Sequence, residues 1–198
     1  MVPARINLRV YQGSTFNETY RWESSTKTYS PISTIDRSAP CVIQLVAGSP
    51  KPPVGWRIRV TGVQGMREMN SPNEESYYLV TGIANDNLTI NSVDSTNYSA
   101  HTTGGIVSWN TPVPLAGYTA KMQIRESIGT PLILELTTAN GGIVLDTVNY
   151  TIRILMTSQQ TALFNFPVAL YSLELTDTLG AINIFMTGSV TLVQEITT

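Results

Sequence analysis

The segment PLAGYTAKMQIRES, residues 114–127, is the most regular stretch of the chain. It begins with turn residues and continues into a strand in which apolar and polar side chains alternate. Such alternation predicts a half-buried strand, and its buried face carries Tyr118, Ala120, Met122 and Ile124. The best candidate for its pairing partner is FNETYRWES, residues 16–24, far upstream. The long sequence between the two segments therefore needs an explanation.

Composition favours a protein built from β-strands. Of the 198 residues, 42% are hydrophobic and only 13% are charged, whereas globular proteins have roughly 25% charged residues. Thr, Ser and Asn fill the polar positions, and Thr suits the half-wet surface of a sheet. The net charge of −2 comes without any basic run, so we expect no nucleic-acid interface.

Targeting and redox signals are weak. Residues 1–10 lack the apolar core of a signal peptide, and there is no run of ~18 apolar residues that would span a membrane. Cys41 is the single cysteine, so no internal disulfide can form. We therefore expect no membrane partner.

The two-residue alternation recurs on both sides of the middle of the chain. It is present in residues 5–13, 132–138, 150–156, 168–177 and 182–196. Short strands separated by turns at this spacing predict a β-sandwich. Residues 157–166 interrupt them as one short helical turn, capped by Thr157 or Ser158, with Leu163 covering a sheet end. We expect a bulge or bend at Gly188.

Residues 37–111 have a different character. SPKPPVG, residues 49–55, cannot be a central strand, and the short strands after it are separated by loops rich in turn residues. The sequence therefore predicts an all-β protein in which residues 1–36 and 112–198 form a sandwich. A small β-barrel, residues 37–111, is inserted between two of its strands, which is tolerable because the cost of closing a loop grows slowly with its length.

The sequence contains no convincing catalytic cluster. His101 lies in a predicted loop and Cys41 at a predicted domain boundary, so they would pair only by coincidence of folding. Three carboxylate sets were considered: the solvated Glu74–Glu75, Glu23 with Glu126, and Glu135 with Glu174. Pairing with arginines across strands is the commoner fate of such groups. We therefore predict no catalytic residue and no enzyme activity.

Metal and cofactor signals are also weak. Residues 85–87 with Asp94 could offer oxygen ligands to calcium, but a hairpin turn explains residues 85–87 better. The glycine pairs at 104–105 and 141–142 are not followed by helices, so neither predicts a phosphate loop. We predict no metal-binding or cofactor-binding residue and no cofactor.

The sandwich half resembles a family of tailed-bacteriophage virion proteins. The resemblance rests on VYQGSTFNETYRW, PLAGYTAKMQIRESIGTPLILELTTANGGIVLD, YTIRILMTSQQTAL and YSLELTDTLGAINIFMTGSVTLVQEIT, in that order. These motifs are also similar to the N-terminal domain of upper-baseplate proteins, an immunoglobulin-like sandwich that attaches a receptor-binding device to the tail. The chain departs from the pattern at Ala116, where Thr is usual, and in the inserted block.

The inserted block resembles a second module. IRVTGVQGMREMN, followed by SYYLVTGI and SAHTTGGIV, is similar to the small β-barrel named after the FCCH domain of ubiquitin-activating enzymes, which recurs in phage structural proteins. Met69 and Leu88 replace the usual Leu and aromatic residue. Gly62 and Gly65 would allow a tight turn, with Met66 and Met69 packed under it.

The two resemblances imply a virion structural protein that acts through contacts between subunits. Its partners would be other phage structural proteins, and it would form a homo-oligomer on the particle. It would be located at the tail, as a baseplate, tail-tip or fibre-adaptor component. It would be made in the host bacterial cytoplasm. Alternatives are a capsid decoration or neck protein, or a carbohydrate-binding module using Tyr77, Tyr78, Tyr98 or Trp109. Residues 5–10 and 191–197 are predicted edge strands that could extend a neighbour's sheet.

Overall fold

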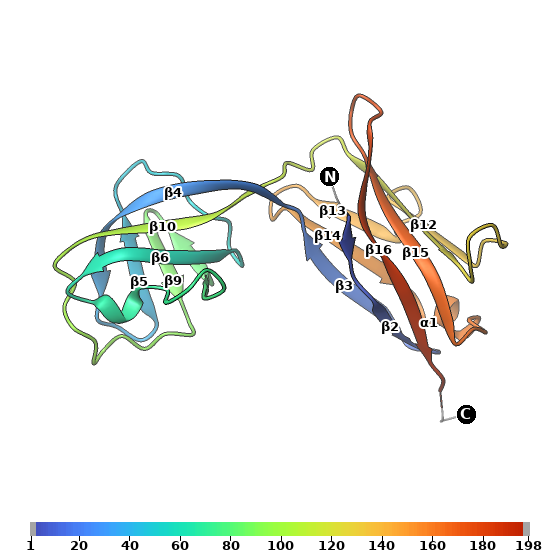
Figure 1. Ribbon diagram of the computed structural model, residues 1–198, viewed down its shortest axis with the longest axis horizontal. Coiled ribbons are helices and arrows are strands. Elements are labelled where there is room, and N and C mark those ends of the chain that lie inside the picture. The colour runs from blue at the N-terminus through green and yellow to red at the C-terminus, as the bar shows by residue number, and fades with distance from the viewer. Residues whose placement is uncertain (1–2, 196–198) are drawn as a thin grey trace. The chain divides into compact units, whose positions relative to one another are not determined.

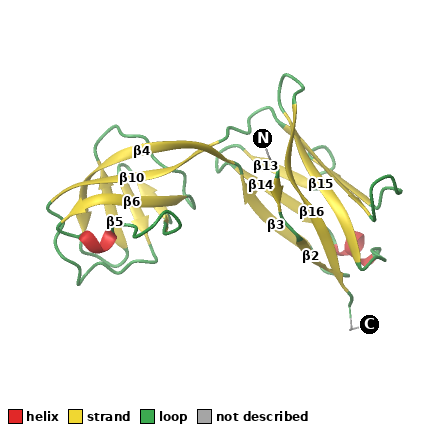
Figure 2. Ribbon diagram, viewed as in Figure 1, coloured by secondary structure: helices red, strands yellow, loops and turns green. Residues whose placement is uncertain are grey.

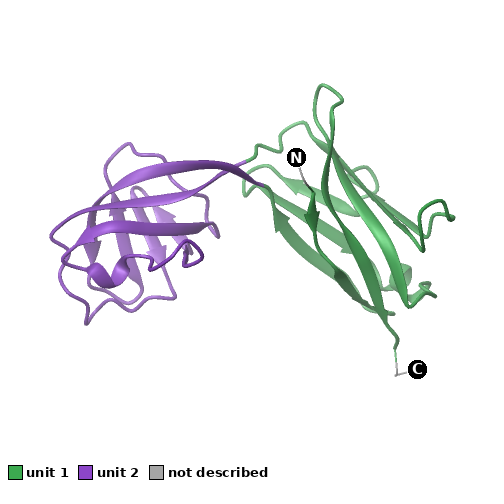
Figure 3. Cartoon of the chain, in the orientation of Figure 1, with its two compact units in different colours: residues 1–22, 113–198 green, residues 23–112 purple. Residues whose placement is uncertain are grey.

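The computed structural model describes residues 3–195 and divides into two compact units. Residues 1–22 and 113–198 belong to the first, the sandwich unit, and residues 23–112 to the second, the barrel unit (Figure 3). Almost every regular element is a strand (Figure 2). The predicted all-β fold, with a sandwich and a separate small barrel, is therefore confirmed, and each unit is described by itself below.

The first boundary between the units differs from the predicted one. The sequence placed residues 1–36 and 112–198 in the sandwich and 37–111 in the barrel, whereas the structure makes its first division between Trp22 and Glu23. The reason is strand pairing. Strand β4 (Glu23–Asp36) pairs with β10 (Thr103–Pro112) and with β5 (Cys41–Leu45), both of which lie in the barrel unit.

The sandwich unit contains two sheets (Figure 1). The larger has the order β1-β16-β15-β11-β12, with β2 also paired to β16, and the smaller has the order β13-β14-β3. The strands of the larger sheet are β1 (Ala4–Arg5), β2 (Leu8–Tyr11), β11 (Thr119–Arg125), β12 (Leu134–Thr137), β15 (Val168–Thr176) and β16 (Ile182–Val193). The strands of the smaller sheet are β3 (Phe16–Arg21), β13 (Ile143–Asp146) and β14 (Thr151–Met156).

The inner faces of these two sheets share one hydrophobic core. Ala120, Met122 and Ile124 of β11 are buried, as their alternation predicts. Alternate residues of β14 and β15 join them: Ile152, Ile154, Met156, Ala169, Tyr171, Leu173 and Leu175. Full burial of one such aliphatic or aromatic side chain stabilises the fold by about 1.5–3 kcal/mol, so this core supplies the main driving force for the sandwich.

A short helix, α1 (Ser158–Ala162), follows β14 as predicted. Thr157 is its N-cap: the Thr157 hydroxyl accepts a hydrogen bond from the backbone of Gln160, and the Gln160 side chain accepts one from the backbone of Thr157. The prediction that Leu163 covers a sheet end is wrong, because Leu163 is 83% exposed. Phe164, one residue later, is the side chain that packs into the core.

The strand pairing expected for residues 114–127 is wrong. Strand β11 pairs with β12 and β15 in the larger sheet, whereas β3 pairs with β14 in the smaller one. The barrel is therefore inserted at a crossover between the two sheets and not in a hairpin. The chain leaves β3 at Trp22 and returns at Val113, whose backbone N–H donates a hydrogen bond of 3.0 Å to the carbonyl of Trp22.

The two predicted edge segments pair with each other. Strand β2 runs parallel to the end of β16, with Arg9 opposite Thr191 and Tyr11 opposite Val193. Residues 191–193 are thus covered and form no free edge. Of the rest of that predicted edge, residues 194 and 195 follow the end of β16, and residues 196 and 197 lie outside the described residues. The pairing is favoured because it buries Leu8 and Val10 in the core. A bulge was expected at Gly188. The register between β15 and β16 instead shifts between Leu173 and Glu174 of β15, and not at Gly188.

The barrel unit is built from one sheet with the order β7-β6-β10-β4-β5-β9-β8. The remaining strands are β6 (Arg57–Gln64), β7 (Tyr78–Leu79), β8 (Gly82–Ala84) and β9 (Asn87–Ile90), and a 3₁₀ turn, η1 (Arg67–Met69), follows β6. The two ends of the sheet, β7 and β8, are neighbours in sequence. One kinked segment, residues 78–84, therefore closes the sheet into a small barrel.

The turn after β6 packs as the sequence predicts. Gly62 and Gly65 have φ angles of 74° and 81°, which side chains other than hydrogen rarely tolerate. Met66 and Met69 are fully buried beneath the turn. Asn70 ties the turn down, because its side-chain oxygen accepts from the N–H of Val63 and its amide donates to the carbonyl of the same residue.

Candidate functional site

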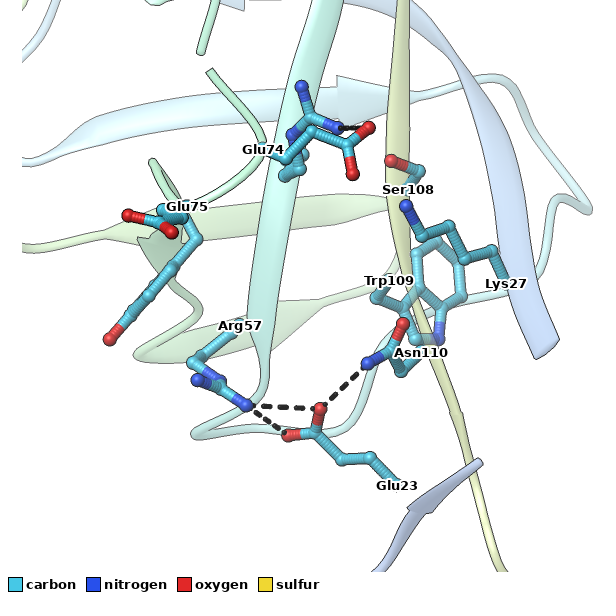
Figure 4. Close-up of a pocket in the computed structure, with 10 residues that line it drawn as sticks. Glu23, Lys27, Arg57, Glu74, Glu75, Ser108, Trp109 and Asn110 are labelled. Carbon is cyan, nitrogen blue, oxygen red and sulfur yellow. Dashed lines mark hydrogen bonds and ion pairs between the residues drawn. The ribbon is translucent and has the colours of Figure 1, made fainter. Parts of the chain in front are cut away.

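The candidate site is a groove of about 320 Å³ on the barrel unit, here called the barrel groove (Figure 4). Strand β6 contributes Arg57 and Arg59, and β10 contributes Ser108 and Asn110. Strand β10 also contributes Trp109, and strand β4 and the loop before β7 supply the rest of the lining: Glu23, Lys27, Glu74, Glu75 and Tyr77. The cations of β6 point the same way because residues two apart in a strand share a face.

One end of the barrel groove is closed by a three-residue network. The guanidinium of Arg57 donates to both carboxylate oxygens of Glu23, each at 3.2 Å, and the side chain of Asn110 donates to one of them at 3.1 Å (Figure 4). Burial opposes the charge of Arg57, but Glu23 and Tyr77 more than compensate, so that the pKa of Arg57 is raised. This network fixes Glu23 as an acceptor.

The other end of the groove has cationic groups with spare hydrogen-bonding capacity. Arg59 forms an ion pair of 3.2 Å with Glu74, but its Nε is buried and has no hydrogen-bond partner among the described residues. The ammonium group of Lys27 has neither an ion-pair nor a hydrogen-bond partner within residues 3–195. The Nε of Arg59 is therefore an unpaired buried donor, which is rare, whereas the side chain of Lys27 is exposed and accessible to an incoming anion.

Tyr77 forms the aromatic wall. Its ring is 52% exposed, and the guanidinium of Arg57 lies 5.0 Å from the ring centre. A cation over an aromatic face contributes about 0.5–1 kcal/mol at an exposed site. The groove therefore offers charged and hydrogen-bonding contacts in fixed positions, and its chemistry suits polar recognition.

Of the four aromatic residues predicted as sugar platforms, Tyr77 and Trp109 line the barrel groove, whereas Tyr78 and Tyr98 do not. Trp109 is buried, with 4% of its surface exposed, and is part of the barrel wall. Tyr78 and Tyr98 are half-buried, and burial raises the pKa of the Tyr78 hydroxyl. Tyr77 alone presents an exposed ring, with Arg57 over it.

Cys41 and His101 occupy separate environments. The thiol of Cys41 is buried in strand β5, 4.0 Å from the sulfur of Met69, so the predicted position at a domain boundary is wrong. Burial raises the pKa of this thiol, which disfavours the reactive thiolate. His101 contacts the backbone carbonyl of Gly104 at 3.0 Å.

The oxygen-rich segments considered for calcium have local roles. Residues 85 and 86 form the turn between β8 and β9, with Asn85 at a φ of 54°, and Asn87 begins β9. Asp86 forms an ion pair of 2.9 Å with Lys51. Asp94 accepts hydrogen bonds from the backbone and side chain of Thr96, which lower its pKa.

Of the three carboxylate sets, Glu74 and Glu75 both line the barrel groove. Glu23 belongs to the barrel unit and Glu126 to the sandwich unit. Glu135 and Glu174 lie on opposite sides of β11, where Glu135 accepts from Gln123 at 2.7 Å and Glu174 pairs with Lys121 at 3.7 Å. In the part of the chain that the structure describes, no three His, Cys, Asp or Glu side chains are placed to hold a metal ion.

The barrel groove was not predicted from the sequence. Arg57 and Arg59 alternate with the buried Ile58 and Val60 in RIRV, which is a signal that two cations share one exposed face. Their partners Glu23 and Glu74 come from distant segments and could not be assigned without the fold.

Comparison with protein-family models and with curated proteins gives no match to this chain. Among residues 3–195, no helix is long and apolar enough to cross a membrane. The resemblance to phage virion proteins therefore stays a prediction from the sequence.

Proposed function

We propose that this chain is a structural protein of a tailed-bacteriophage particle, located at the tail as a baseplate, tail-tip or fibre-adaptor component. The observation that carries the proposal is the insertion of a closed barrel at the sheet crossover of a sandwich. Each unit has its own buried core, so each can present a surface to a different neighbour. This suits a protein that joins subunits, and the order of motifs in the sandwich half supplies the link to phage.

The charged groups of the barrel groove support a role in contacts over a role in catalysis. Glu23, for example, is held by both Arg57 and Asn110. A carboxylate that several donors hold in one position is suited to a fixed contact surface. A general acid or base instead needs access to the group whose proton it moves. The two alternatives within the virion are a capsid decoration protein and a neck protein.

A carbohydrate-binding module remains the alternative of a different class. The observation in its favour is the exposed ring of Tyr77 beside polar groups in the barrel groove. Saturable binding to one class of host polysaccharide on a glycan array, lost in Tyr77→Ala, would support it.

Gold-labelled antibody against this chain, applied to intact particles and viewed by electron microscopy, tests the proposal. We expect label at the distal end of the tail. Label over the head would support a capsid decoration protein, and label at the neck would support a neck protein. Particles without label, with the chain also absent from their denatured protein bands, would overturn the virion role.

A further inference from the structure

The outer face of the larger sheet of the sandwich unit carries a second concavity. It has a volume of about 530 Å³ and spans strands β1, β16, β15 and β11. We call it the basic trough and define it by Arg5, Gln123, Arg125, Ile128, Leu170, Ser172, Thr187 and Ser189. Strand register explains its floor: Thr187 stands opposite both Arg5 and Ser172, and Ser172 stands opposite Gln123.

Most of the central residues of the basic trough are small, although Leu170 of β15 also lines it. Ser172, Thr187 and Ser189 occupy the middle strands, while the long side chains of Arg5 and Arg125 stand on the outer strands, at two sides of the trough. Three strand spacings separate β1 from β11, or about 14 Å between backbones. A short turn of another protein can therefore enter between the two arginines.

The charge of the trough is positive. Both charged residues that line it are arginines, and no Asp or Glu lines it among the described residues. Arg125 is held in place, because it donates to the carbonyl of Thr130 at 2.6 Å and to Gln123 at 3.3 Å. Arg5 has no hydrogen-bond or ion-pair partner within residues 3–195.

A segment of the same chain carries the complementary charge. Residues 72–76 form an exposed turn in which the side chain of Asn73 accepts from the backbone of Glu75 and from Ser76. This acidic turn projects Glu74, whose side chain is 83% exposed, and Glu75, which has no side-chain partner among the described residues. The pair of Glu74 with Arg59 is a surface ion pair of about 0–1 kcal/mol, so Glu74 can change partners.

We propose that the acidic turn of one copy of this chain docks in the basic trough of a second copy. The contact joins two different surfaces, so repetition produces a head-to-tail ring or filament. Both surfaces are already ordered, which lowers the entropic cost of association. The proposal extends the structural role above by naming the partner, and its test uses purified protein, so its failure leaves the virion location untouched.

A charge exchange tests the contact. Sedimentation of the purified chain at micromolar concentrations should show mass increasing with concentration, and about 0.5 M salt should suppress this, since the Debye length then falls to ~4 Å. Arg125→Glu and Glu75→Arg should each weaken self-association at least tenfold. An equimolar mixture of the two variants should associate again, because each trough then meets a turn of opposite charge.

The control is Arg153→Glu, which reverses an exposed charge on β14 outside the trough and should leave association unchanged. Circular dichroism melts of each variant establish that it is folded. A wild-type chain that stays monomeric at every concentration, or a mixture that fails to restore association, would overturn the proposal. Equal weakening by Arg153→Glu would overturn it as well, because it would indicate a general charge effect.

Discussion

The hydroxyl of Tyr171 donates a hydrogen bond of 2.7 Å to the backbone carbonyl of Ile6. The bond crosses from β15, beneath β16, to the segment that links β1 and β2. Gly188 lies beside it, and a methyl group at this position would overlap the same carbonyl oxygen. The position of the N-terminal strands therefore depends on the hydroxyl of Tyr171 and on the absence of a side chain at Gly188.

Tyr171→Phe should destabilise the sandwich unit by about 1 kcal/mol, the usual worth of one intramolecular hydrogen bond. Gly188→Ala should cost about 1–3 kcal/mol, because the added methyl overpacks the contact with Ile6. Urea denaturation measures both. Gly82→Ala is the matched control, since its methyl would meet the Thr89 side chain at an ordinary 3.5 Å. If Gly188→Ala is no more harmful than Gly82→Ala, the close approach has no energetic role.

Tyr171 also predicts a loss of stability in alkali. Burial raises its pKa above the ordinary value of 10.0, so the folded state keeps the proton at a pH where the unfolded chain has lost it. The contribution of this group is complete below about pH 10 and falls as the pH rises further. The free energy of unfolding, measured by urea denaturation between pH 8 and pH 11, should decline more steeply for the wild type than for Tyr171→Phe. Parallel curves for the two proteins would rule out Tyr171 as the source.

Removal of the barrel should leave a folded sandwich when the cut follows the structure. Val113 already donates a hydrogen bond to the carbonyl of Trp22, which is the bond of a two-residue β-turn. Replacing residues 23–112 by Asn-Gly should therefore give a protein with one cooperative thermal transition. Replacing residues 37–111 instead should give a poorly soluble protein, because Ile32 and Ile35 of β4 would lose the barrel core. Cooperative unfolding of the second protein, but not the first, would contradict the boundary at residue 22.

Glu18 should protect the edge of the smaller sheet. Strand β3 is the last strand of that sheet, and Glu18 lies exposed between Phe16 and Tyr20 on the face that turns toward the core. An inward-facing charge on an edge strand discourages pairing with another chain. Glu18→Val should increase light scattering during storage at high concentration. Thr19→Val, on the opposite face of the same strand, should have a smaller effect; the reverse order would indicate that surface hydrophobicity alone drives aggregation.

The position of β2 also changes the effect expected on deleting residues 1–10. On the sequence alone these residues are a detachable edge, so their loss would leave the rest of the sandwich folded. In the structure Leu8 and Val10 are 4% and 0% exposed within the core. Losing two such side chains removes several kcal/mol of stabilisation that comes from their burial. The melting temperature of the truncated sandwich should therefore fall sharply. An unchanged melting temperature would show that β2 contributes little.

The sequence by itself determined which residues face inward. Alternation placed the core residues of β11 correctly and separated the two faces of β14 and β15, because a strand turns alternate side chains to opposite faces whatever its partner is. Composition and turn residues likewise indicated two β modules, and Thr157 indicated the start of α1. These features depend on a few neighbouring residues.

Only the tertiary structure decided which strands pair and which charged side chains meet. Strand β3 pairs with β14 and not with β11, β2 covers β16, and β4 belongs to the barrel. The contacts of Glu23 with Arg57 and of Tyr171 with Ile6 follow from that pairing. Alternation fixes the face of a strand but says nothing of its neighbour, since many strands offer equivalent backbone hydrogen bonds. The choice among them is made by the packing of the whole core.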